Sequence, residues 1–264
     1  MNGKSLQGKV AIVTGAGRGI GRGIAMAYAA EGAKVAVVSR TPSTVEAVAR
    51  EIKDAGGEAI GIACDVGQRD QVFAAVDQTV KAFGTVHILV NNAQGFGTEA
   101  EPRASTVFMA MEDTDEDEWE YTFRTGATAS LWFMKAVFPH MKAQYYGKII
   151  NFASSSGQMG FPGNTCYNAT KEAIRALTRT AANEWGQHGI TVNVINPALE
   201  TRAFDAWKTA RPEFVEALKE KIPMRRLGDP DKDAGPIAVF LASPGSDYMT
   251  GGTFMLEGGM HTLP

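Results

Sequence analysis

The sequence predicts an α/β fold in which a single domain, residues 1–264, is built on a doubly wound, seven-stranded parallel sheet with helices on both faces. Short apolar runs alternate with longer segments of helical periodicity from one end of the chain to the other. The runs are apolar at nearly every position, as expected for strands buried on both faces of a sheet. No linker, repeat or low-complexity segment divides the chain.

The expected strands are short runs rich in Val, Ile and Ala, at residues 10–13, 35–38, 59–63, 88–90, 149–152, 191–195 and 254–256. Helix signals lie between them. Thr41-Pro42 offers an N-cap residue followed by proline, and Gly56-Gly57 ends the same helix. Two connections, 95–118 and 199–230, are long for this fold, and a short helix is expected at 213–221 in the second. Long loops at the ligand-binding edge are typically lids.

Composition excludes several classes of protein. The net charge is −3 and 44% of residues are hydrophobic, which is ordinary for a soluble globular protein and unlike a disordered chain. The slight acidity is unlike the basic footprint of a nucleic-acid-binding domain. No apolar run reaches the ~20 residues of a membrane helix, and the first residues lack the apolar core of a signal peptide. With only two cysteines, a reducing compartment is expected, so we predict a cytoplasmic protein.

A glycine-rich segment, residues 14–21, lies between the first expected strand and the first expected helix. Glycine lets the backbone turn tightly and approach a pyrophosphate, and the amides at the start of a helix favour the bound anion. The placement therefore predicts a dinucleotide site. Its expected contacts are Gly15, Arg18, Gly19, Ile20 and Gly21.

The end of the second expected strand, Ser39-Arg40, bears on the choice of cofactor. An acidic residue here would bind the ribose 2′-hydroxyl of NAD, whereas an arginine accommodates the 2′-phosphate of NADP. No Asp or Glu occurs in residues 34–45, and Arg40 and Arg18 could both contact that phosphate. We therefore expect NADP(H) rather than NAD(H). NAD(H) remains the alternative if both arginines are simply solvated.

The expected catalytic group combines a phenol, an ammonium and a hydroxyl. Tyr167 and Lys171 are four residues apart, on one face of a helix. A free phenol has a pKa near ~10, and a nearby positive charge lowers it. Tyr167 could then serve as the acid in ketone reduction or as the base in alcohol oxidation. Ser154, directly after the strand at 149–152, could hydrogen-bond the substrate oxygen as charge develops.

Taken with these motifs, the chain resembles the short-chain dehydrogenases/reductases of the typical kind over nearly its whole length. Further matching segments are 64–66, 91–93, 193–197, 226–228 and 258–259. The resemblance implies a seven-stranded Rossmann sheet, a nicotinamide cofactor, and transfer of the 4-pro-S hydride to or from a secondary alcohol or ketone. It also implies a homo-oligomer, a tetramer or dimer, with helices around 117–141 and 166–187 paired between subunits.

The resemblance assigns further roles. Asp65 would bind the adenine, and Asn92 and Ala93 would line the cofactor ribose. Lys171 would hold the nicotinamide ribose hydroxyls as well as tune Tyr167. Thr201 would approach the carboxamide. The other implied cofactor contacts are Val66, Pro197 and Tyr167 itself.

Three positions depart from the family pattern. Gln94 stands where Gly usually follows Asn-Asn-Ala, and Ala198 replaces the usual Gly after Pro197. Gly126 falls at the helix position of the family's catalytic asparagine, which is thought to support a water joining the lysine to a proton relay. This glycine leaves open a non-redox chemistry, dehydration or epimerisation, or a degenerate nucleotide-sensing protein. Alternatively, it only allows close helix packing.

The substrate is expected to be an apolar ketone or secondary alcohol, cyclic or acyl-chain, because apolar side chains gather in the segments that should rim the site. The alternative is that these side chains are scattered core or oligomer contacts. No cluster of His, Cys or Asp has metal-ligand spacing, so no metal is expected. The candidate substrate contacts are Gln94, Phe96, Ser154, Met159, Phe161 and Phe204, with Trp207 near them.

Overall fold

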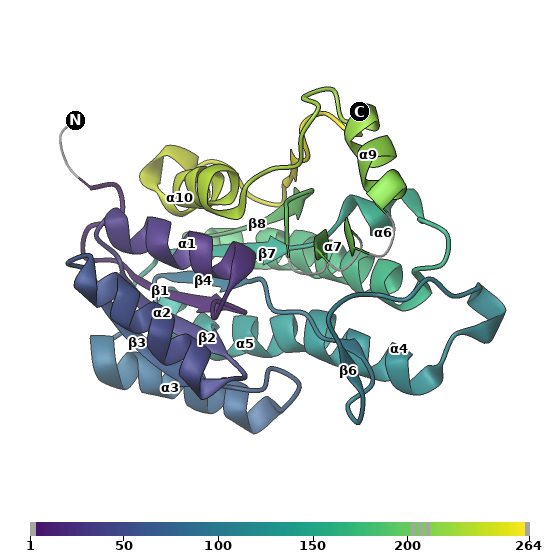
Figure 1. Cartoon of the computed structure of the whole chain (residues 1–264). Helices are drawn as coiled ribbons and strands as arrows, with labels where there is room; N and C mark the ends of the chain where they lie inside the picture. The colour runs from purple at the N-terminus through teal and green to yellow at the C-terminus, as the bar shows by residue number, and fades with distance from the viewer. Residues whose placement is uncertain (1–3, 202–203, 206–207, 210–211, 262–264) are drawn as a thin grey trace.

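Seven parallel strands form the central sheet, in the order β3-β2-β1-β4-β7-β8-β9 (Figure 1). The structure is a computed structural model that describes residues 4–201, 204–205, 208–209 and 212–261. The chain runs outward from β1 to β3 and then, from β4, builds the other half of the sheet. This is the predicted doubly wound arrangement. The strands are β1 (Val10–Thr14), β2 (Lys34–Ser39), β3 (Glu58–Ala63), β4 (Ile88–Asn91), β7 (Gly147–Phe152), β8 (Ile190–Pro197) and β9 (Thr253–Leu256).

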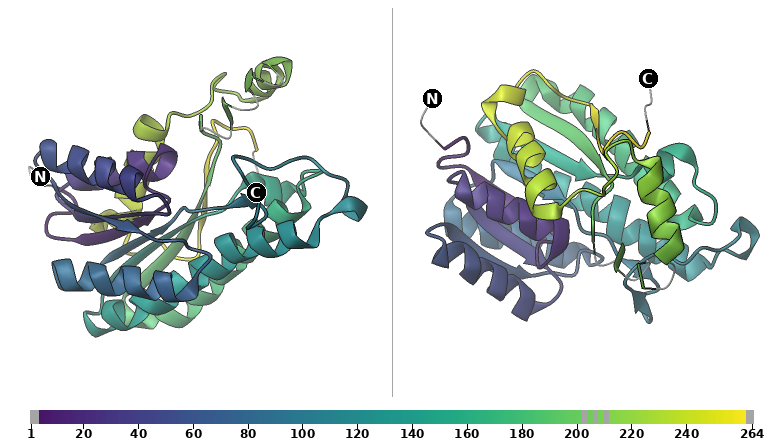
Figure 2. Two further views of the ribbon diagram at one scale, coloured as in Figure 1. Left: turned by 60° about the horizontal axis from the view of Figure 1, so that its bottom comes forward. Right: turned by 45° about the horizontal axis from the view of Figure 1, so that its top comes forward.

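Helices cover both faces of the sheet. One hydrophobic cluster joins the strands to α1 (Gly19–Ala30), α2 (Pro42–Asp54) and α10 (Gly235–Ala242). A second cluster, on the opposite face, joins them to α3 (Arg69–Phe83), α5 (Ala129–Ala143) and α7 (Thr165–Trp185). In Figure 1, α1 and α10 lie above the sheet and α3 and α5 below it. The short helix α9 (Pro212–Lys221), close to the predicted 213–221, stands outside these layers (Figure 2).

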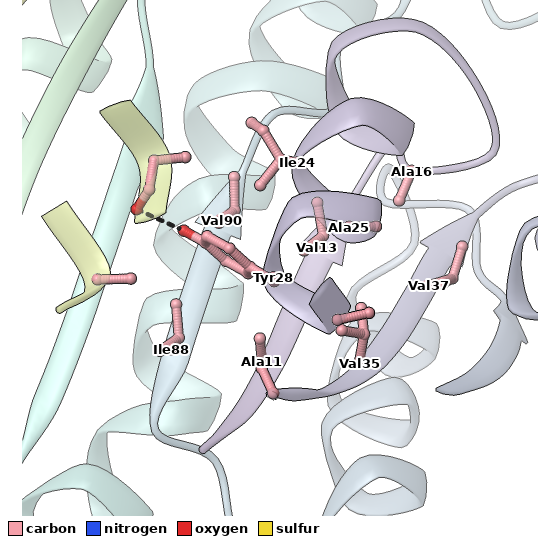
Figure 3. Close-up of a cluster of buried hydrophobic side chains, with 14 of the residues drawn as sticks. Ala11, Val13, Ala16, Ile24, Ala25, Tyr28, Val35, Val37, Ile88 and Val90 are labelled. Atoms are coloured by element: carbon pink, nitrogen blue, oxygen red, sulfur yellow. Dashed lines mark hydrogen bonds between the residues drawn. The ribbon is translucent and has the colours of Figure 1, made fainter. Parts of the chain in front are cut away.

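The continuous apolarity of the strands follows from this two-sided cover. On β1, Ala11 and Val13 belong to the first cluster and Ile12 to the second, so successive side chains enter opposite cores. Within the first cluster, the Tyr28 hydroxyl donates a 3.1 Å hydrogen bond to the Ala238 carbonyl and joins α1 to α10. Figure 3 shows Tyr28 of α1 beside side chains from the strands. These are Ala11, Val13, Val35, Val37, Ile88 and Val90.

The predicted helix around 117–141 consists of three parts. It begins as α4 (Glu116–Phe123), continues as a π-helical turn (Arg124–Thr128) and becomes α5. A π-helical turn is rare and is often found at a functional site. Gly126, which departs from the family pattern in sequence, lies in the middle of this turn and therefore also departs from regular α-helical geometry.

The long connection after β4 contains elements that the sequence did not predict. A two-stranded hairpin forms from β5 (Phe96–Gly97) and β6 (Pro102–Arg103), followed by a short 3₁₀ turn (Met111–Asp113). The other short helix, α6 (Ser155–Met159), follows β7. At α2, Thr41 holds the predicted N-cap position, although its side chain makes no capping hydrogen bond. No helix within the described ranges is long and apolar enough to cross a membrane.

Candidate active site

The predicted site residues gather at one edge of the sheet. Gly15 follows β1, Asn92 follows β4, Ser154 lies two residues beyond β7, and Pro197 ends β8. These strands are parallel, so their carboxyl ends meet at the same edge. In doubly wound sheets this edge is where ligands bind.

Buried polar side chains hold the strand ends and α7 together. Asn91 on β4 donates from Nδ2 to Asn151 Oδ1 on β7 at 2.9 Å, and Asn151 Nδ2 donates to Thr178 Oγ1 on α7 at 2.8 Å. All three side chains are at most 5% exposed. A fully paired polar network inside a core fixes one relative placement of the elements that carry it.

The loops after β1 and β4 fit against each other closely. Gly15 has a φ of +65°, and a Cβ there would lie 2.8 Å from Asn92 Nδ2. Thr14 Oγ1 accepts hydrogen bonds from the amides of Asn92 and Ala93. Sequence reasoning missed the role of Thr14. A buried threonine ending an otherwise apolar strand was the signal that could have revealed it.

The start of α1 is shaped to receive an anion. Arg18 holds the N-cap position in extended conformation, and no side chain caps the helix. Gly19 has a φ of +55°, and nothing lies within 4 Å of where its Cβ would be. The uncapped amides of the first turn therefore face open space, the arrangement that a pyrophosphate requires. These residues fit a dinucleotide.

The side chains expected at the adenosine end follow β2 and β3. Arg40 is exposed and its Nη1 donates to the Tyr121 hydroxyl at 3.3 Å, a contact that no sequence pattern indicates. Ser39 ends β2. Asp65 Oδ1 accepts from the Gly67 amide at 2.8 Å, which fixes the turn after β3, and Val66 beside it is buried.

The expected catalytic side chains come together around the end of β7. Ser154 is the N-cap of α6, and its Oγ accepts from the Ser156 amide at 3.1 Å. Its hydroxyl also hydrogen-bonds the Tyr167 phenol. One helical turn further along α7, Lys171 Nζ donates to the Phe152 carbonyl at 3.0 Å and lies 5.3 Å from the centroid of the Tyr167 ring.

Burial governs the protonation of this group. It raises the pKa of Tyr167 above its ordinary value of 10, and the hydrogen bond from Ser154 opposes that rise. Burial lowers the pKa of Lys171 to about 7. The expected net lowering of the phenol's pKa is therefore not found: the shift is upward, because desolvation of the phenol is its largest cause.

Aromatic side chains surround the phenol of Tyr167, the expected catalytic group. The Phe96 ring centroid lies 5.7 Å from that of Tyr167, and the Phe108 and Phe161 rings are 6.2 Å apart. Met159 and Phe161 are 50% and 43% exposed, so this rim presents apolar surface to solvent. Beside Tyr167 a hollow opens between residues 106–118 and 163–167.

One other predicted substrate contact lies elsewhere. Phe204 is buried in a separate cluster with Val215, Ile222 and Leu227, so it packs beneath α9 rather than facing substrate. Trp207 lies outside the described residues. Of the two cofactor contacts expected beyond β8, Pro197 ends the strand and the Thr201 carbonyl accepts from the Asp205 amide at 2.9 Å.

Gln94 also differs from its expected role as a substrate contact. Its Nε2 donates to the carbonyls of Gly95 and Thr122, at 2.9 and 3.0 Å. Both amide hydrogens are thereby directed at the backbone of the loop and of α4. The side chain faces the helix and not the aromatic rim.

A doubly wound sheet, an uncapped glycine-rich helix start and a Ser-Tyr-Lys group with a buried lysine together define a nicotinamide-dependent dehydrogenase or reductase. The family described as enoyl-(acyl carrier protein) reductase matches residues 15–261. The chain belongs to the short-chain dehydrogenase/reductase family.

Its relatives include enzymes with different substrates. A 12alpha-hydroxysteroid dehydrogenase of Clostridium sp. is 38% identical, over 97% of this chain and 98% of its own length. A 3-oxoacyl-(acyl-carrier-protein) reductase of Staphylococcus epidermidis is also 38% identical, over 96% and 99%.

Solved structures of the same fold hold either cofactor. A 7 alpha-hydroxysteroid dehydrogenase with NADH and 7-oxo glycochenodeoxycholic acid is 32% identical, with a TM-score of 0.87 and coverage of 96% of this chain and 94% of that one. A gluconate 5-dehydrogenase from Burkholderia cenocepacia with NADP and tartrate is 32% identical, with a TM-score of 0.88 and coverage of 98% and 97%.

Proposed function

We propose that this protein is an NADP(H)-dependent oxidoreductase that interconverts a secondary alcohol and a ketone on an apolar substrate. The observation that carries the proposal is the group of half-buried Ser154 and Tyr167 with buried Lys171, which lies beside an aromatic rim and at the same sheet edge as the dinucleotide cradle. Each residue can be given one step of the chemistry.

A nicotinamide held at this edge supplies the hydride in reduction and accepts it in oxidation. Tyr167 donates its phenolic proton to the carbonyl oxygen as charge develops there, and takes the proton back when an alcohol is oxidised. The Ser154 oxygen accepts from the Ser156 amide, and its O–H, which bonds the Tyr167 phenol in the protein alone, would turn to the substrate oxygen when a substrate is bound.

Lys171 holds the phenol in place and supports its ionised form. The hydrogen bond from Nζ to the Phe152 carbonyl fixes the ammonium close to the Tyr167 ring. When Lys171 is protonated, its charge stabilises the phenolate that remains after proton donation. Since burial brings the pKa of Lys171 to about 7, the protonation of this lysine changes within the neutral range.

NADP(H) is proposed from the residues that follow β2. Arg40 is exposed at the end of this strand, Arg18 is exposed at the start of α1, and residues 34–45 contain no carboxylate. Two guanidinium groups favour the 2′-phosphate. The structural relatives were solved with NADH in one case and NADP in the other, so the proposal rests on these residues alone.

The substrate is proposed to be apolar and cyclic, with an acyl chain as the second candidate. The pair of half-buried Phe108 and exposed Phe161, together with Phe96 beside Tyr167, offers ring faces that suit a flat hydrocarbon skeleton. The hydroxysteroid dehydrogenase among the relatives supports this choice, and the 3-oxoacyl reductase supports the second.

A substrate panel tests the proposal. Ketosteroids, cyclic ketones, 3-oxoacyl thioesters and sugar acids are each offered with NADPH and with NADH, and absorbance is followed at the nicotinamide band. We expect turnover of cyclic ketones with NADPH at a higher kcat/KM than with NADH. Turnover of sugar acids alone, or product formation without net cofactor change, would refute it.

The proposal includes a homo-oligomer, a tetramer or dimer, in the cytoplasm. Trp119 on α4 and Leu131 on α5 are 39% and 37% exposed, and Trp132 lines a surface hollow between them. These helices are those expected to pair between subunits. Sedimentation at micromolar concentration should give a species heavier than one chain, and a single-chain mass would contradict this part of the proposal.

A further inference from the structure

The space beside Gly126 is filled by a side chain from another part of the chain. A Cβ added at Gly126 would overlap Thr170 Cγ2 and would lie 2.6 Å from Gln94 Oε1 and 3.2 Å from Gln94 Nε2. The carboxamide of Gln94 therefore occupies the position into which a side chain at 126 would project. In this arrangement Gln94 could not lie where it does beside a side chain at 126.

Gln94 fastens the loop after β4 to the π-helical turn. Its Nε2 donates to the Thr122 carbonyl, one turn before Gly126, while the amide of the next residue, Gly95, donates to Thr125 Oγ1 at 3.1 Å. In a π-helical turn the usual i to i−4 pairing is shifted, and carbonyls there accept from other groups. Gln94 supplies such a group to the Thr122 carbonyl just before the turn, and Gly95 donates to a threonine hydroxyl within it.

The carboxamide oxygen of Gln94 differs from the nitrogen in having no hydrogen-bond partner among the described residues. This atom, Oε1, is buried. A buried acceptor without a partner is costly and is expected to receive a hydrogen bond, commonly from a bound water. This oxygen faces Gly126, against which Thr170 packs, and Thr170 directly precedes Lys171 on α7.

We propose that Gln94 is a positioning residue of this active site, and the inference rests on the function proposed above. Its carboxamide, supplied by the loop, replaces the side chain absent at Gly126. It holds the π-helical turn against the part of α7 that carries Lys171, and it offers Oε1 to a bound water there. Where the family pattern has glycine at 94 and asparagine at 126, this chain has glutamine at 94 and glycine at 126. The two differences thus form one reciprocal change, which keeps a side-chain amide at this point of the site.

The first test compares two glutamines that make the same kind of hydrogen bond. Gln144 Nε2 donates to the Val86 and Tyr146 carbonyls, at 2.8 and 3.1 Å, away from the site. Methionine keeps the length of either side chain but removes its donors and acceptor. We expect Gln94→Met to lower kcat about tenfold with KM within about twofold, and to shift the pH profile of kcat. Gln144→Met should leave kcat and its pH profile unchanged.

The second test restores the family arrangement. Asparagine at 126 needs both Gln94 and the Thr170 methyl removed, because both would clash with its Cβ. Thr170→Ser removes the methyl and keeps the hydroxyl that donates to the Cys166 carbonyl. We expect the triple variant Gln94→Gly/Gly126→Asn/Thr170→Ser to recover most of the kcat lost in Gln94→Gly/Thr170→Ser, with Thr170→Ser alone near wild type.

A third measurement needs no turnover. Amide hydrogen exchange of residues 122–128 in the protein alone should be faster in Gln94→Met than in Gln144→Met, by about tenfold or more. Unchanged exchange, or unchanged kcat and pH profile in Gln94→Met, would overturn the inference. If the wild type turns over nothing in the panel, the proposed function fails, while the exchange result still decides whether Gln94 holds the turn.

Discussion

Lys171 Nζ donates its hydrogen bond to the carbonyl oxygen of Phe152, the last residue of β7 and two residues before Ser154. This bond ties α7, which carries Tyr167 and Lys171, to the strand that Ser154 follows. The network of Asn91, Asn151 and Thr178 makes the same connection deeper in the core. The position of Tyr167 and Lys171 relative to the end of β7 is therefore set by regular elements, and Ser154 is the N-cap residue of α6, two residues further on.

Removing the phenolic hydroxyl should stop turnover without weakening cofactor binding. Tyr167→Phe keeps the ring beside Phe96 but can no longer transfer a proton, so we expect kcat to fall about a hundredfold or more. The rate is measured at the nicotinamide band, and cofactor binding by fluorescence titration. Tyr248→Phe, at a fully exposed tyrosine, is the control. Full activity in Tyr167→Phe would refute the role of the phenol.

The buried lysine should make stability depend on pH. The pKa of Lys171 is about 7 in the folded protein and 10.5 in the unfolded chain, so between these values the unfolded chain binds the extra proton and stability rises with pH. Lys171→Met has no titrating group at this position, so its free energy of unfolding should exceed that of the wild type at pH 7. The difference in unfolding free energy should narrow by up to about 2.7 kcal/mol between pH 7 and pH 9. Urea unfolding at both values measures it, and parallel pH profiles would contradict it.

Charge at the end of β2 should set the cofactor preference. Arg40→Asp places a carboxylate where it repels a 2′-phosphate and can accept from a ribose 2′-hydroxyl. We expect the ratio of NADPH to NADH affinity to fall about tenfold or more, measured by titration with each cofactor. Tyr121→Phe removes only the 3.3 Å contact with Arg40 and should leave the ratio unchanged. An unaltered ratio in Arg40→Asp would argue against the NADP(H) assignment.

A histidine far from the site should contribute to acid sensitivity. His87 Nδ1 accepts from the Val10 amide at 3.0 Å, and burial together with the charge of Lys9 lowers its pKa to about 4. Because the folded pKa lies below the unfolded value of 6.5, stability is lost as the pH falls from 6.5 to 4. His87→Asn keeps an acceptor without a titrating group and should lose about 1–2 kcal/mol less over this range. Unfolding midpoints at pH 6.5 and 4.5 provide the test.

Most of the sheet could be predicted because each strand is indicated by a short apolar run in its own segment of the sequence. Apolar runs such as 10–13 and 149–152 are strands buried at every position, and the pattern alone predicts that. The small hairpin at Phe96–Gly97 and Pro102–Arg103 has no apolar run and was missed. The π-helical turn was missed because its Thr125 hydroxyl, and the Thr122 carbonyl just before it, are bound by a loop distant in sequence.

The site was predictable where a residue type implies its own chemistry. Tyr167, Lys171 and Ser154 come together as their spacing and placement indicated. The Phe152 carbonyl carries no sequence signal, because every residue has that group. Gln94 and Gly126 were recognised as two separate departures, and only their contact in space makes them one.

The division between strand ends and loops has a consequence for how such proteins diversify. Tyr167, the proposed proton donor, and Lys171 lie on α7, and Ser154 follows β7. The aromatic side chains around them belong largely to the connections 95–115 and 160–164. Mutations in those connections can alter which molecules are accepted without disturbing the groups that react. A lineage carrying this scaffold can therefore acquire new substrates through surface changes while inheriting its chemistry intact.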